Sequence, residues 1–433
     1  MLNLLRLVKG GFMYHICRYL LKKFIQKGRL TIHIDGYPPL IIEGEDGFED
    51  VHIKLQDRKT LLQIVFDPDL AIGESYMDGQ LQIETGGLSE FLNLLMRNET
   101  CWQEHLLGKI SNFLFGLGAS MRTVNRPIRA KRNVAHHYDL DERLYDTFLD
   151  SWRQYSCGYF TDNTTTIEAA QRLKLARIGA KLCLKPDQKI LDIGCGWGGL
   201  AYALQLFAPS AHITGITLSE RQLAYTKLAA SYPRADNGHL PEFRLLDYRS
   251  VAEGYDRIVS VGMLEHVGPQ HYDSYFAKIA EILASDGVAL IHTIGRYGPP
   301  VPTSRWLDKY IFPGGYLPDL TQLHKAIQRA GLLITDIEVM RLHYARTLHH
   351  WRQRFDHHKE DMRTLYDDRF VRMWDFYLAA SEAYFLQGAG MVLQIQLAHD
   401  QQAVPLTRDY IAEHSATYEQ ILCQSQNSGK PKP

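Results

Sequence analysis

The sequence lacks several features that would place it in a special class of protein. No run of about 18 or more apolar residues occurs in it, which excludes a transmembrane helix of ordinary length from this sequence. The six cysteines are far apart and form neither a CxxC pair nor a Cys/His ligand spacing. A disulfide scaffold and a structural zinc site are therefore disfavoured, and a reducing cytoplasm is favoured.

A large net charge is also missing. The 433 residues carry 48 Lys and Arg against 49 Asp and Glu, so no long-range field draws the whole chain onto nucleic acid. With 45% hydrophobic and 22% charged residues, the composition is that of an ordinary folded protein. At roughly 150 residues per domain, this length predicts two or three domains.

The small total hides two basic segments. Residues 1–34 contain seven Lys or Arg and no acid, and residues 105–138 contain six and again none. Such segments steer that end of the protein towards an anionic bilayer, although ordinary solvated helix faces give the same count. The first segment lacks the apolar stretch and the cleavage site of a signal peptide. We predict one or two short amphipathic helices there, packed on the protein itself or on a membrane surface.

The first quarter of the chain is predicted to be a small α+β domain. Alternation of apolar and polar residues predicts strands at 30–35, 51–56 and 61–66, and a helix is expected over 88–107. The predicted boundaries are 1–105 for this domain, 106–133 for a basic linker, 134–400 for a larger domain and 401–433 for a frayed C-terminal tail.

The larger domain alternates short apolar segments with helical patterns. The hydroxyls of Thr164, Thr165 and Thr166 suit the N-cap of a helix that ends before Pro186. The alternation predicts an α/β fold with a doubly wound, mostly parallel sheet, and a helical block is expected over about 345–388. The predicted strands lie at 189–193, 212–216, 243–246, 257–261, 288–294, 332–339 and 391–398.

A glycine-rich turn, DIGCGWGG at 192–199, follows the first of these strands and opens a helix. Glycines at 194, 196 and 198 permit a tight turn and a close approach of the backbone to a ligand, and Asp192 ends the strand. The spacing is GxGxG, whereas dinucleotide folds use GxGxxG, and no acid closes the second strand. NAD and FAD are therefore disfavoured, and the turn resembles motif I of S-adenosylmethionine-dependent methyltransferases.

The end of the second strand offers Thr217, and Gln222 follows five residues later. A hydroxyl and an amide could hold a ribose in place of the usual carboxylate. The alternative is structural, because residues 219–222 (SERQ) also fit a capping box in which Gln222 satisfies only backbone donors.

Seven blocks that occur in order make the chain resemble a known family. With GESYMDG (73–79) they closely resemble the cyclopropane-fatty-acid synthases and the related mycolic-acid methyltransferases, essentially over residues 133–398. The resemblance implies a seven-stranded methyltransferase sheet with a helical insertion, S-adenosylmethionine as cofactor and a homodimer. The blocks are HHYDLDERLYDTFLD (136–150), YSCGYF (155–160), LDIGCGWGGLA (191–201), GITLSERQ (215–222), DRIVSVGMLEHVG (256–268), LIHTIG (290–295) and KYIFPGGYLP (309–318).

The resemblance implies methylene transfer to a lipid. A cis alkene of a phospholipid acyl chain attacks the sulfonium methyl of S-adenosylmethionine, a proton is lost and a cyclopropane ring closes; a mid-chain methyl or methylene branch is the alternative product. Because an isolated alkene is a poor nucleophile and the intermediate is a carbocation, the site must be dry and must hold a base. In the family this base is a bound bicarbonate.

Matching the motifs places the bicarbonate-binding set at Cys157, Glu265, His292, Tyr344 and the backbone of Ile294. Glu265 and His292 also lie at or after strand ends, where α/β folds place ligands. Each side chain has a structural alternative: a buried thiol, a helix-start charge, a core histidine or a packing aromatic.

The cofactor contacts implied by the resemblance come from five segments of the larger domain. No metal is expected, because adjacent histidines such as His136 and His137 usually point apart and the sequence offers no evident third ligand. The implied cofactor residues are Tyr155, Ser156, Asp192, Gly194, Cys195, Gly196, Gly198, Thr217, Leu218, Gln222, Asp247 and Tyr248.

Two further features of the helical block bear on the chemistry. Ser381 stands where some relatives carry a cysteine, which excludes a thiol nucleophile at that position. Several aromatic residues either line an acyl tunnel or pack in the core. These aromatic residues are Trp306, Tyr310, Trp374, Phe376 and Tyr377.

The expected partner is unsaturated phospholipid in a bilayer, with no nucleic acid. The expected location is cytoplasmic, with peripheral association at the inner leaflet. Two other functions stay open: a methyltransferase for soluble small molecules, and a lipid-binding or regulatory module with a dead catalytic domain.

Overall fold

The computed structural model describes residues 2–104, 140–163, 165–228, 232–235 and 238–428. The predicted linker at 106–133 and the pair His136 and His137 lie outside these ranges. The described chain forms two compact units. The N-terminal unit comprises Met1–Ser120, Val301–Ile311 and Trp351–Ala389, and the C-terminal unit comprises Met121–Pro300, Phe312–His350 and Gly390–Pro433.

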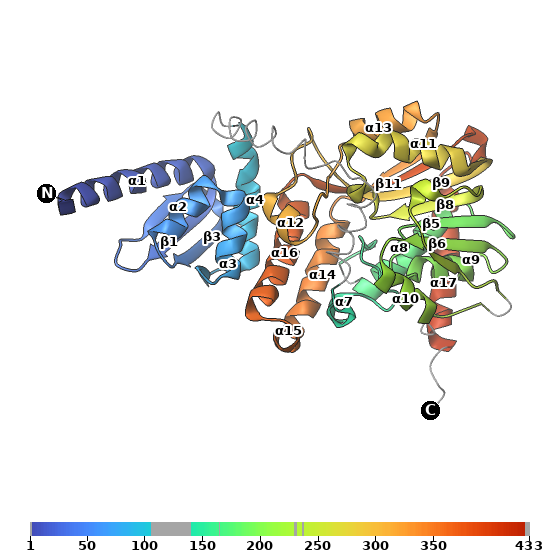
Figure 1. Ribbon diagram of the computed structural model, residues 1–433, viewed down its shortest axis with the longest axis horizontal. Helices are drawn as coiled ribbons and strands as arrows, with labels where there is room; N and C mark the ends of the chain where they lie inside the picture. The colour runs from blue at the N-terminus through green and yellow to red at the C-terminus, as the bar shows by residue number, and fades with distance from the viewer. Residues whose placement is uncertain (1, 105–139, 164, 229–231, 236–237, 429–433) are drawn as a thin grey trace. The chain divides into compact units, whose positions relative to one another are not determined.

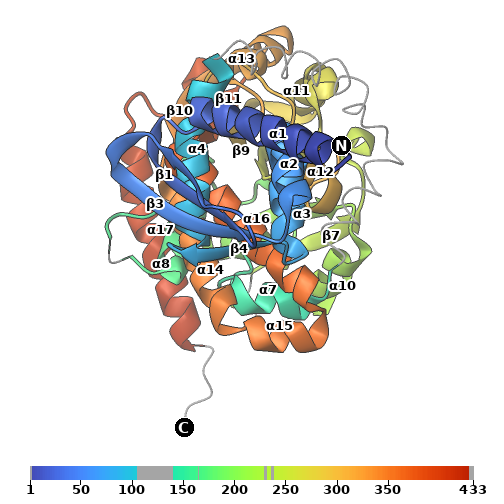
Figure 2. The same ribbon diagram turned by 90° about the vertical axis from the view of Figure 1, so that its left-hand side faces the viewer.

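The N-terminal unit contains a four-stranded sheet in the order β2-β1-β3-β4. β1 pairs antiparallel with β2 and parallel with β3, and β3 pairs antiparallel with β4. A single helix, α1 (Leu2–Phe24), lies against α2 and α4 (Figure 2). The strands are β1 (Lys27–Ile34), β2 (Leu40–Glu43), β3 (Glu45–Leu55) and β4 (Leu81–Thr85), and the helices include α2 (Arg58–Phe66), α3 (Pro68–Met77), α4 (Leu88–Glu104), α12 (Arg305–Tyr310), α15 (Lys359–Leu365) and α16 (Asp368–Gln387).

The predicted helix over 88–107 is confirmed by α4, but the predicted strand at 61–66 is wrong. Residues 61–66 belong to helix α2, whose N-cap Asp57 accepts a hydrogen bond from the Thr60 N–H at 2.8 Å. Leu61 is buried and Phe66 is exposed, so one side of a short helix produced the apparent alternation. The Asp57 side chain accepts a backbone N–H at the start of the helix that would otherwise have no partner, and this favours the helix.

Helices from late in the chain complete the core of the N-terminal unit. The Tyr76 hydroxyl on α3 donates to Asp375 Oδ2 on α16 at 3.1 Å, and Lys359 Nζ donates to the same oxygen at 2.9 Å. A Cβ at Gly73 would lie 2.4 Å from the Trp306 indole, so glycine lets α12 pack on α3. The prediction of one continuous domain over 134–400 therefore differs from this division, because 301–311 and 351–389 bury their apolar side chains here.

The aromatic residues of these segments form this core. The Trp306 and Phe376 rings lie 4.8 Å apart, and Trp374 and Tyr377 lie 5.2 Å apart. All four side chains are buried. Tyr310 instead receives a hydrogen bond from Arg369 and donates one to Glu74.

The C-terminal unit contains a seven-stranded sheet in the order β10-β11-β9-β8-β5-β6-β7 (Figure 1). Only β11 runs antiparallel to its neighbours, β9 and β10, so the prediction of a mostly parallel sheet is confirmed. All seven strands occur where the sequence predicts them. They are β5 (Lys189–Ile193), β6 (His212–Thr217), β7 (Glu242–Leu245), β8 (Tyr255–Val261), β9 (Leu283–Arg296), β10 (Leu333–Val339) and β11 (Gly390–Ala398).

Helices cover both faces of this sheet because its strands are apolar on both sides. Leu191 and Ile193 pack with α11 and α13, whereas Ile190, the residue before Leu191, packs with α8, α9 and α17. Thr166 is the N-cap of α8, as predicted. The helices are α7 (Glu142–Phe148), α8 (Ile167–Lys181), α9 (Gly199–Phe207), α10 (Glu220–Leu228), α11 (Tyr272–Ile282), α13 (Leu320–Arg329) and α17 (Asp409–Ser428), and α14 (His343–His357) crosses the boundary between the units.

The prediction of a frayed C-terminal tail at 401–433 is wrong for residues 409–428. These residues form α17, which packs on α8 and α9. Ile411 and Leu422 are buried, and the Tyr418 ring stacks on Phe207 with 4.3 Å between centroids. Across the described ranges, no helix combines the length and the apolar character needed to cross a bilayer.

Candidate active site

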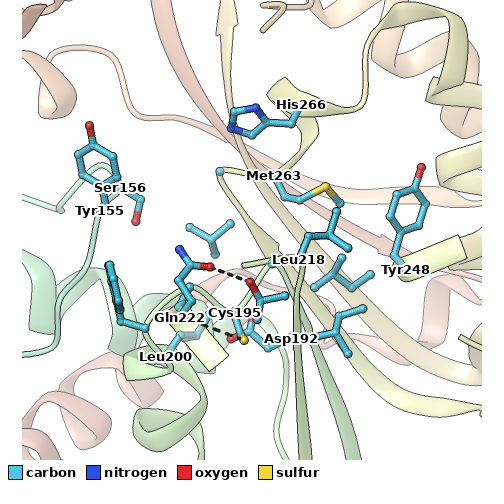
Figure 3. Close-up of a pocket in the computed structure, with 18 of the residues that line it drawn as sticks. Tyr155, Ser156, Asp192, Cys195, Leu200, Leu218, Gln222, Tyr248, Met263 and His266 are labelled. Atoms are coloured by element: carbon cyan, nitrogen blue, oxygen red, sulfur yellow. Dashed lines mark hydrogen bonds between the residues drawn. The ribbon is translucent and has the colours of Figure 1, made fainter. Parts of the chain in front are cut away.

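A pocket opens at the carboxyl ends of β5, β6 and β8 in the C-terminal unit. Figure 3 shows Tyr155 and Ser156 on one side of it, Tyr248 on the other side, and Met263 and His266 between them. Parallel strands end together at this edge, so loops from distant parts of the sequence converge there.

The glycine-rich turn forms one wall and needs glycine for its backbone. Gly194, Gly196 and Gly198 have φ values of +80°, +54° and +86°, a region that other residues rarely adopt. A Cβ at Gly198 would also lie 3.0 Å from both Phe243 and Thr226, so a side chain there would collide. The N–H groups of Gly194 and Cys195 both donate to the Ile216 carbonyl, at 2.9 and 3.0 Å, which fastens the turn to β6.

The structure separates the two readings of Thr217 and Gln222. The Thr217 hydroxyl donates to Gln222 Oε1 at 2.7 Å, and both side chains line the pocket. The backbone N–H of Ser219 donates to Thr217 Oγ1 at 3.1 Å, so it is not capped by Gln222. Ser219 Oγ does accept from the Gln222 N–H at 3.2 Å. Half of a capping box is present, and the Gln222 side chain belongs to the pocket.

Asp192 is a buried carboxyl group at the end of β5. It is 1% exposed, and its Oδ2 atom has no hydrogen-bond partner among the described residues. Burial raises its pKa to about 7, although the nearby Lys174 cation pulls the pKa down. A buried acceptor without a partner is costly, so this oxygen is suited to an N–H or O–H group of a ligand.

Lys174 is a site residue that the sequence analysis did not single out. It lies on α8, is fully buried, and donates from Nζ to Gln154 Oε1 at 2.5 Å and to Ser156 Oγ at 2.8 Å. Burial lowers its pKa to about 8, and Asp150, Cys157 and Asp192 act in the opposite direction. One buried cation thus fixes the pocket-lining segment that contains Ser156 and balances Asp192.

The adenine-side prediction, Asp247 and Tyr248, also lies at the pocket. The Asp247 carboxylate is engaged by Arg249, with Nε at 2.9 Å and Nη2 at 2.6 Å. It also accepts the Arg249 N–H as the N-cap of a short helical turn, η1 (Tyr248–Ser250). Tyr248 is buried and packs edge-on against Tyr275, so its ring presents a fixed surface.

Of the predicted cofactor residues, all except Gly198 line the pocket, and Gly198 begins the helix that follows the turn. The pocket has further lining residues that the sequence analysis missed. The signal that could have found most of them is their position just after a strand. They are Arg153, Gln154, Ile193, Trp197, Leu200, Ile216, Leu246, Arg249, Val261, Gly262, Met263, His266, Val267 and His271.

Glu265 lies in a short helical turn, η2 (Leu264–His266), between the pocket residues Met263 and His266. Its Oε1 accepts the Ile294 N–H at 2.6 Å, while its buried Oε2 has no hydrogen-bond partner in the described part of the chain. Burial raises its pKa to about 7, against the opposing hydrogen bond from Ile294. The N–H of Ile294 is therefore already engaged in holding this carboxyl group.

His292 is buried near the end of β9, where its Nδ1 lies 3.1 Å from Gln394 Nε2 on β11. Burial, together with the nearby Lys174 and Lys181 cations, lowers its pKa to about 3. The imidazole is consequently neutral at physiological pH.

Cys157 and Tyr344 are both buried. Burial raises the pKa of the Cys157 thiol well above its usual value, so it stays protonated. Thr347, one turn after Tyr344 on α14, accepts the Gly158 N–H at 3.0 Å, and the Cys157 thiol donates to the Gly158 carbonyl at 3.4 Å. α14 is thereby fastened to the segment that carries Cys157.

The structure joins the predicted bicarbonate-binding residues in part. The Ile294 N–H donates directly to Glu265, and Gly158, the residue after Cys157, is hydrogen-bonded to Thr347 on the helix of Tyr344. His292 is connected instead to Gln394 and, electrostatically, to Lys174. None of the five lines the pocket itself, although Glu265 and Cys157 are next to residues that do.

Residues 125–395 match the family described as mycolic acid cyclopropane synthetase. The chain belongs to this family. The cyclopropane-fatty-acyl-phospholipid synthase of Escherichia coli (strain K12) is 34% identical to this member over 340 residues, which are 78% of this chain and 86% of that protein. Family membership makes the protein a methyltransferase enzyme.

Two other relatives in the synthetase family extend the comparison. The tuberculostearic acid methyltransferase UfaA1 of Mycobacterium tuberculosis (strain ATCC 25618 / H37Rv) is 39% identical over 60% of this chain and 63% of its own. A solved structure of mycolic acid cyclopropane synthase CmaA1, complexed with SAH and CTAB, covers 62% of this chain and 97% of its own. It has 29% identity and a TM-score of 0.58.

Proposed function

We propose that this protein transfers a methylene group from S-adenosylmethionine to the cis double bond of an unsaturated phospholipid acyl chain and forms a cyclopropane ring. The similar E. coli protein carries that activity in its name. The observation that carries the proposal is the buried Glu265 carboxyl group beside the pocket, with one oxygen unpartnered among the described residues and a pKa of about 7.

The pocket fits S-adenosylmethionine. The orphan Asp192 oxygen suits an ammonium or a hydroxyl group, and the glycine-rich turn admits a ligand close to the backbone. The paired Thr217 and Gln222 side chains stand where such folds bind a ribose. The similar CmaA1 structure holds SAH, the demethylated form of this compound. When bound, S-adenosylmethionine supplies a methyl group on a sulfonium centre.

The Glu265 region fits a small anion. A carboxyl group with a pKa of about 7 carries its proton about half of the time at neutral pH, and the proton on Oε2 can then be donated to an anion. The neutral His292 ring and the protonated Cys157 thiol add donors without net charge. Bicarbonate would be held by these three side chains together with Tyr344, and it would supply a base for the proton that the substrate carbocation loses.

The residues of the chain then have separate tasks. The buried surroundings of Glu265 and His292 exclude water from a carbocation that water would trap. Glu265 is oriented by the Ile294 N–H, so no reorganisation is needed when charge develops. Ring closure after proton loss distinguishes this reaction from methylation of nitrogen or oxygen.

The test uses purified protein, S-adenosylmethionine and vesicles of a monounsaturated phospholipid. Mass spectrometry of the acyl chains should show the gain of one CH2 group together with loss of the double bond, and proton NMR should show cyclopropane hydrogens. A control without S-adenosylmethionine should show neither change. The proposal would be refuted if no acyl chain gained mass in phospholipids that differ in double-bond position and in head group.

A second candidate is a mid-chain methyl or methylene branch, favoured by the 39% identity to a tuberculostearic acid methyltransferase. A saturated methyl branch needs a reductant in addition to the methyl donor. Acyl-chain fragmentation identifies a branch, because the chain cleaves next to the branched carbon. Proton NMR separates a methylene branch from a ring, because only the methylene branch has alkene hydrogens.

The proposed lipid partner is supported by the surface of the N-terminal unit. Exposed aromatic rings there are covered by cations: Lys23 over Tyr19, Lys27 over Phe48, and Arg58 over Tyr37. Arg58 also lies over the half-buried ring of Tyr14. Aromatic and basic side chains together suit the interface of an anionic bilayer. We therefore propose peripheral binding at the cytoplasmic leaflet. We also propose a homodimer, on the family resemblance alone.

Vesicle co-sedimentation at two salt concentrations tests this binding. The bound fraction should fall when salt is raised or anionic lipid is removed, because the attraction is screened within a Debye length. Light scattering of the same samples gives the oligomeric state. Equal binding to neutral and anionic vesicles would contradict the proposed role of the basic surface.

A further inference from the structure

A chain of buried hydrogen bonds runs from a charged cluster to His292. Lys181 Nζ donates to Glu338 Oε2 at 2.5 Å and to Gln394 Oε1 at 2.7 Å. Gln394 Nε2 then lies 3.1 Å from His292 Nδ1. Lys181, Gln394 and His292 are each at most 2% exposed. No sequence motif reveals these hydrogen bonds, because the four residues come from four separate elements: α8, β10, β11 and β9.

The chemistry of the donors fixes the direction of every bond in this chain. An ammonium group has only donors, so the Gln394 atom that faces Lys181 must be the carbonyl oxygen. The amide nitrogen of Gln394 therefore faces His292, and an amide nitrogen can only donate. His292 Nδ1 must then be the acceptor. In a neutral ring the single proton is left on Nε2.

We propose that Gln394 and Lys181 are positioning residues that lock His292 in the Nε2–H tautomer, so that this histidine serves as a hydrogen-bond donor and not as a base. The tautomer follows from the hydrogen bonds alone, whereas its use, as a donor to the bound anion, rests on the proposed function. The anion itself is then left as the base of the reaction.

The charges around the ring agree with this role. Lys174 and Lys181 disfavour an imidazolium, whereas Glu338 favours it, and Glu338 is already bonded to both Lys181 and Arg177. The pKa of His292 is about 3, so the ring does not take a second proton in the physiological range. A histidine that cannot charge gives a constant donor across changes of pH.

The direct test is the protonation state of His292 in the full chain labelled with ¹⁵N at histidine. Magic-angle-spinning ¹⁵N spectra distinguish a protonated ring nitrogen from an unprotonated one. The protein has 19 histidines, so the His292 signals are assigned by their loss in a His292→Asn variant. We expect a proton on Nε2 and none on Nδ1 at neutral pH.

The isosteric Gln394→Glu substitution should reverse the tautomer. The new carboxylate accepts from Lys181 and from His292, so Nδ1 gains a proton. We expect kcat to fall on the order of a hundredfold, the size typical of losing one aligned donor, while the Kd for S-adenosylmethionine stays within a few-fold of the parent. The pocket does not include either residue, which is why binding should be spared.

The matched control is Gln396→Glu, on the same face of β11. Gln396 is equally buried and donates to the Lys181 carbonyl and to the Tyr410 hydroxyl, without touching His292. The Gln396→Glu variant also places a carboxylate in a buried position, so it should lower stability but leave the His292 tautomer unchanged.

Two results would overturn the inference: a proton on Nδ1 in the parent protein, or an unchanged His292 spectrum in a folded Gln394→Glu variant. The parent spectrum decides the tautomer even when a variant fails to fold. If the tautomer is as expected but no lipid product forms, the proposed function fails and the positioning role of Gln394 stands.

Discussion

Asp192 and Glu265 are two buried carboxyl groups at the carboxyl ends of neighbouring parallel strands of one sheet: Asp192 near the end of β5 and Glu265 just after β8. Each has one oxygen without a hydrogen-bond partner among the described residues, and the pKa of each is about 7. Their surroundings differ. A buried cation, Lys174, acts on Asp192, whereas Glu265 is held by the backbone N–H of Ile294.

This difference indicates different tasks for two similar groups. A cation near Asp192 makes the ionised form available, which suits binding of a positively charged ligand at the pocket wall. Glu265 has only dipoles around it, so its proton is easily kept and donated. Variants that change one carboxyl group and should spare the function of the other test whether the two groups have different tasks.

The largest effect is expected for Glu265→Gln. The amide keeps the shape but cannot exchange a proton, so kcat should fall about a thousandfold or more while the Kd for S-adenosylmethionine stays within a few-fold. Single-turnover kinetics with vesicles and calorimetric titration give the two numbers. A variant that loses binding and keeps its rate at saturation would show that the two carboxyl groups have been assigned the wrong way round.

A smaller effect is expected on the pH dependence of stability. The pKa of Glu265 is raised from 4.5 to about 7, so between these values the folded protein keeps a proton that the unfolded chain has lost. Its contribution to stability therefore falls as pH rises, by about 3 kcal/mol in total. The Glu265→Gln variant lacks this loss, so its free energy of unfolding relative to the parent should rise from pH 4.5 to pH 8, as given by urea titrations across this range.

The His292 ring works in the opposite direction, because its pKa is lowered to about 3. Its contribution grows as pH rises towards the unfolded value, but it is common to both proteins and cancels in the difference. A pH-independent difference between parent and variant would mean that Glu265 is ionised throughout.

The smallest effect is expected for Asp192→Asn. Loss of the ionised acceptor should weaken S-adenosylmethionine binding about tenfold, or about 1.4 kcal/mol, with kcat at saturation nearly unchanged. Asp256→Asn is the matched control, because Asp256 accepts the Lys189 N–H at the opposite end of the same strands. Equal affinity in both variants, measured by calorimetry, would remove Asp192 from the binding site.

The sheet of the C-terminal unit could be predicted from the sequence because its strands are short and apolar and lie between helical segments. The glycine turn was equally legible, since three left-handed residues at 194, 196 and 198 admit little but glycine. Helix α2 was misread because a short helix with one buried side can imitate a strand. Helix α17 was missed because the polar end of the chain hid the stripe formed by Ile411, Tyr418 and Leu422.

The site was predictable only where a motif carries the residue. Lys174 and Gln394 have no motif, and each acts through partners that the fold supplies: Gln154 from before α8, and His292 from 102 residues away. The residue type alone does not show whether a polar side chain is buried or exposed. Only the three-dimensional arrangement shows that its polar atoms are paired and in which direction.

The N-terminal unit consists of segments separated by nearly two hundred residues, and this sets an order on its synthesis. Strands β1–β4 leave the ribosome first, but α16, which packs on α3 and α4, is complete only at Gln387. At about 5–20 residues per second, the early strands and helices wait for tens of seconds before their core can close. During this interval the seven-stranded sheet is being made, so the unit that is first in sequence finishes folding late.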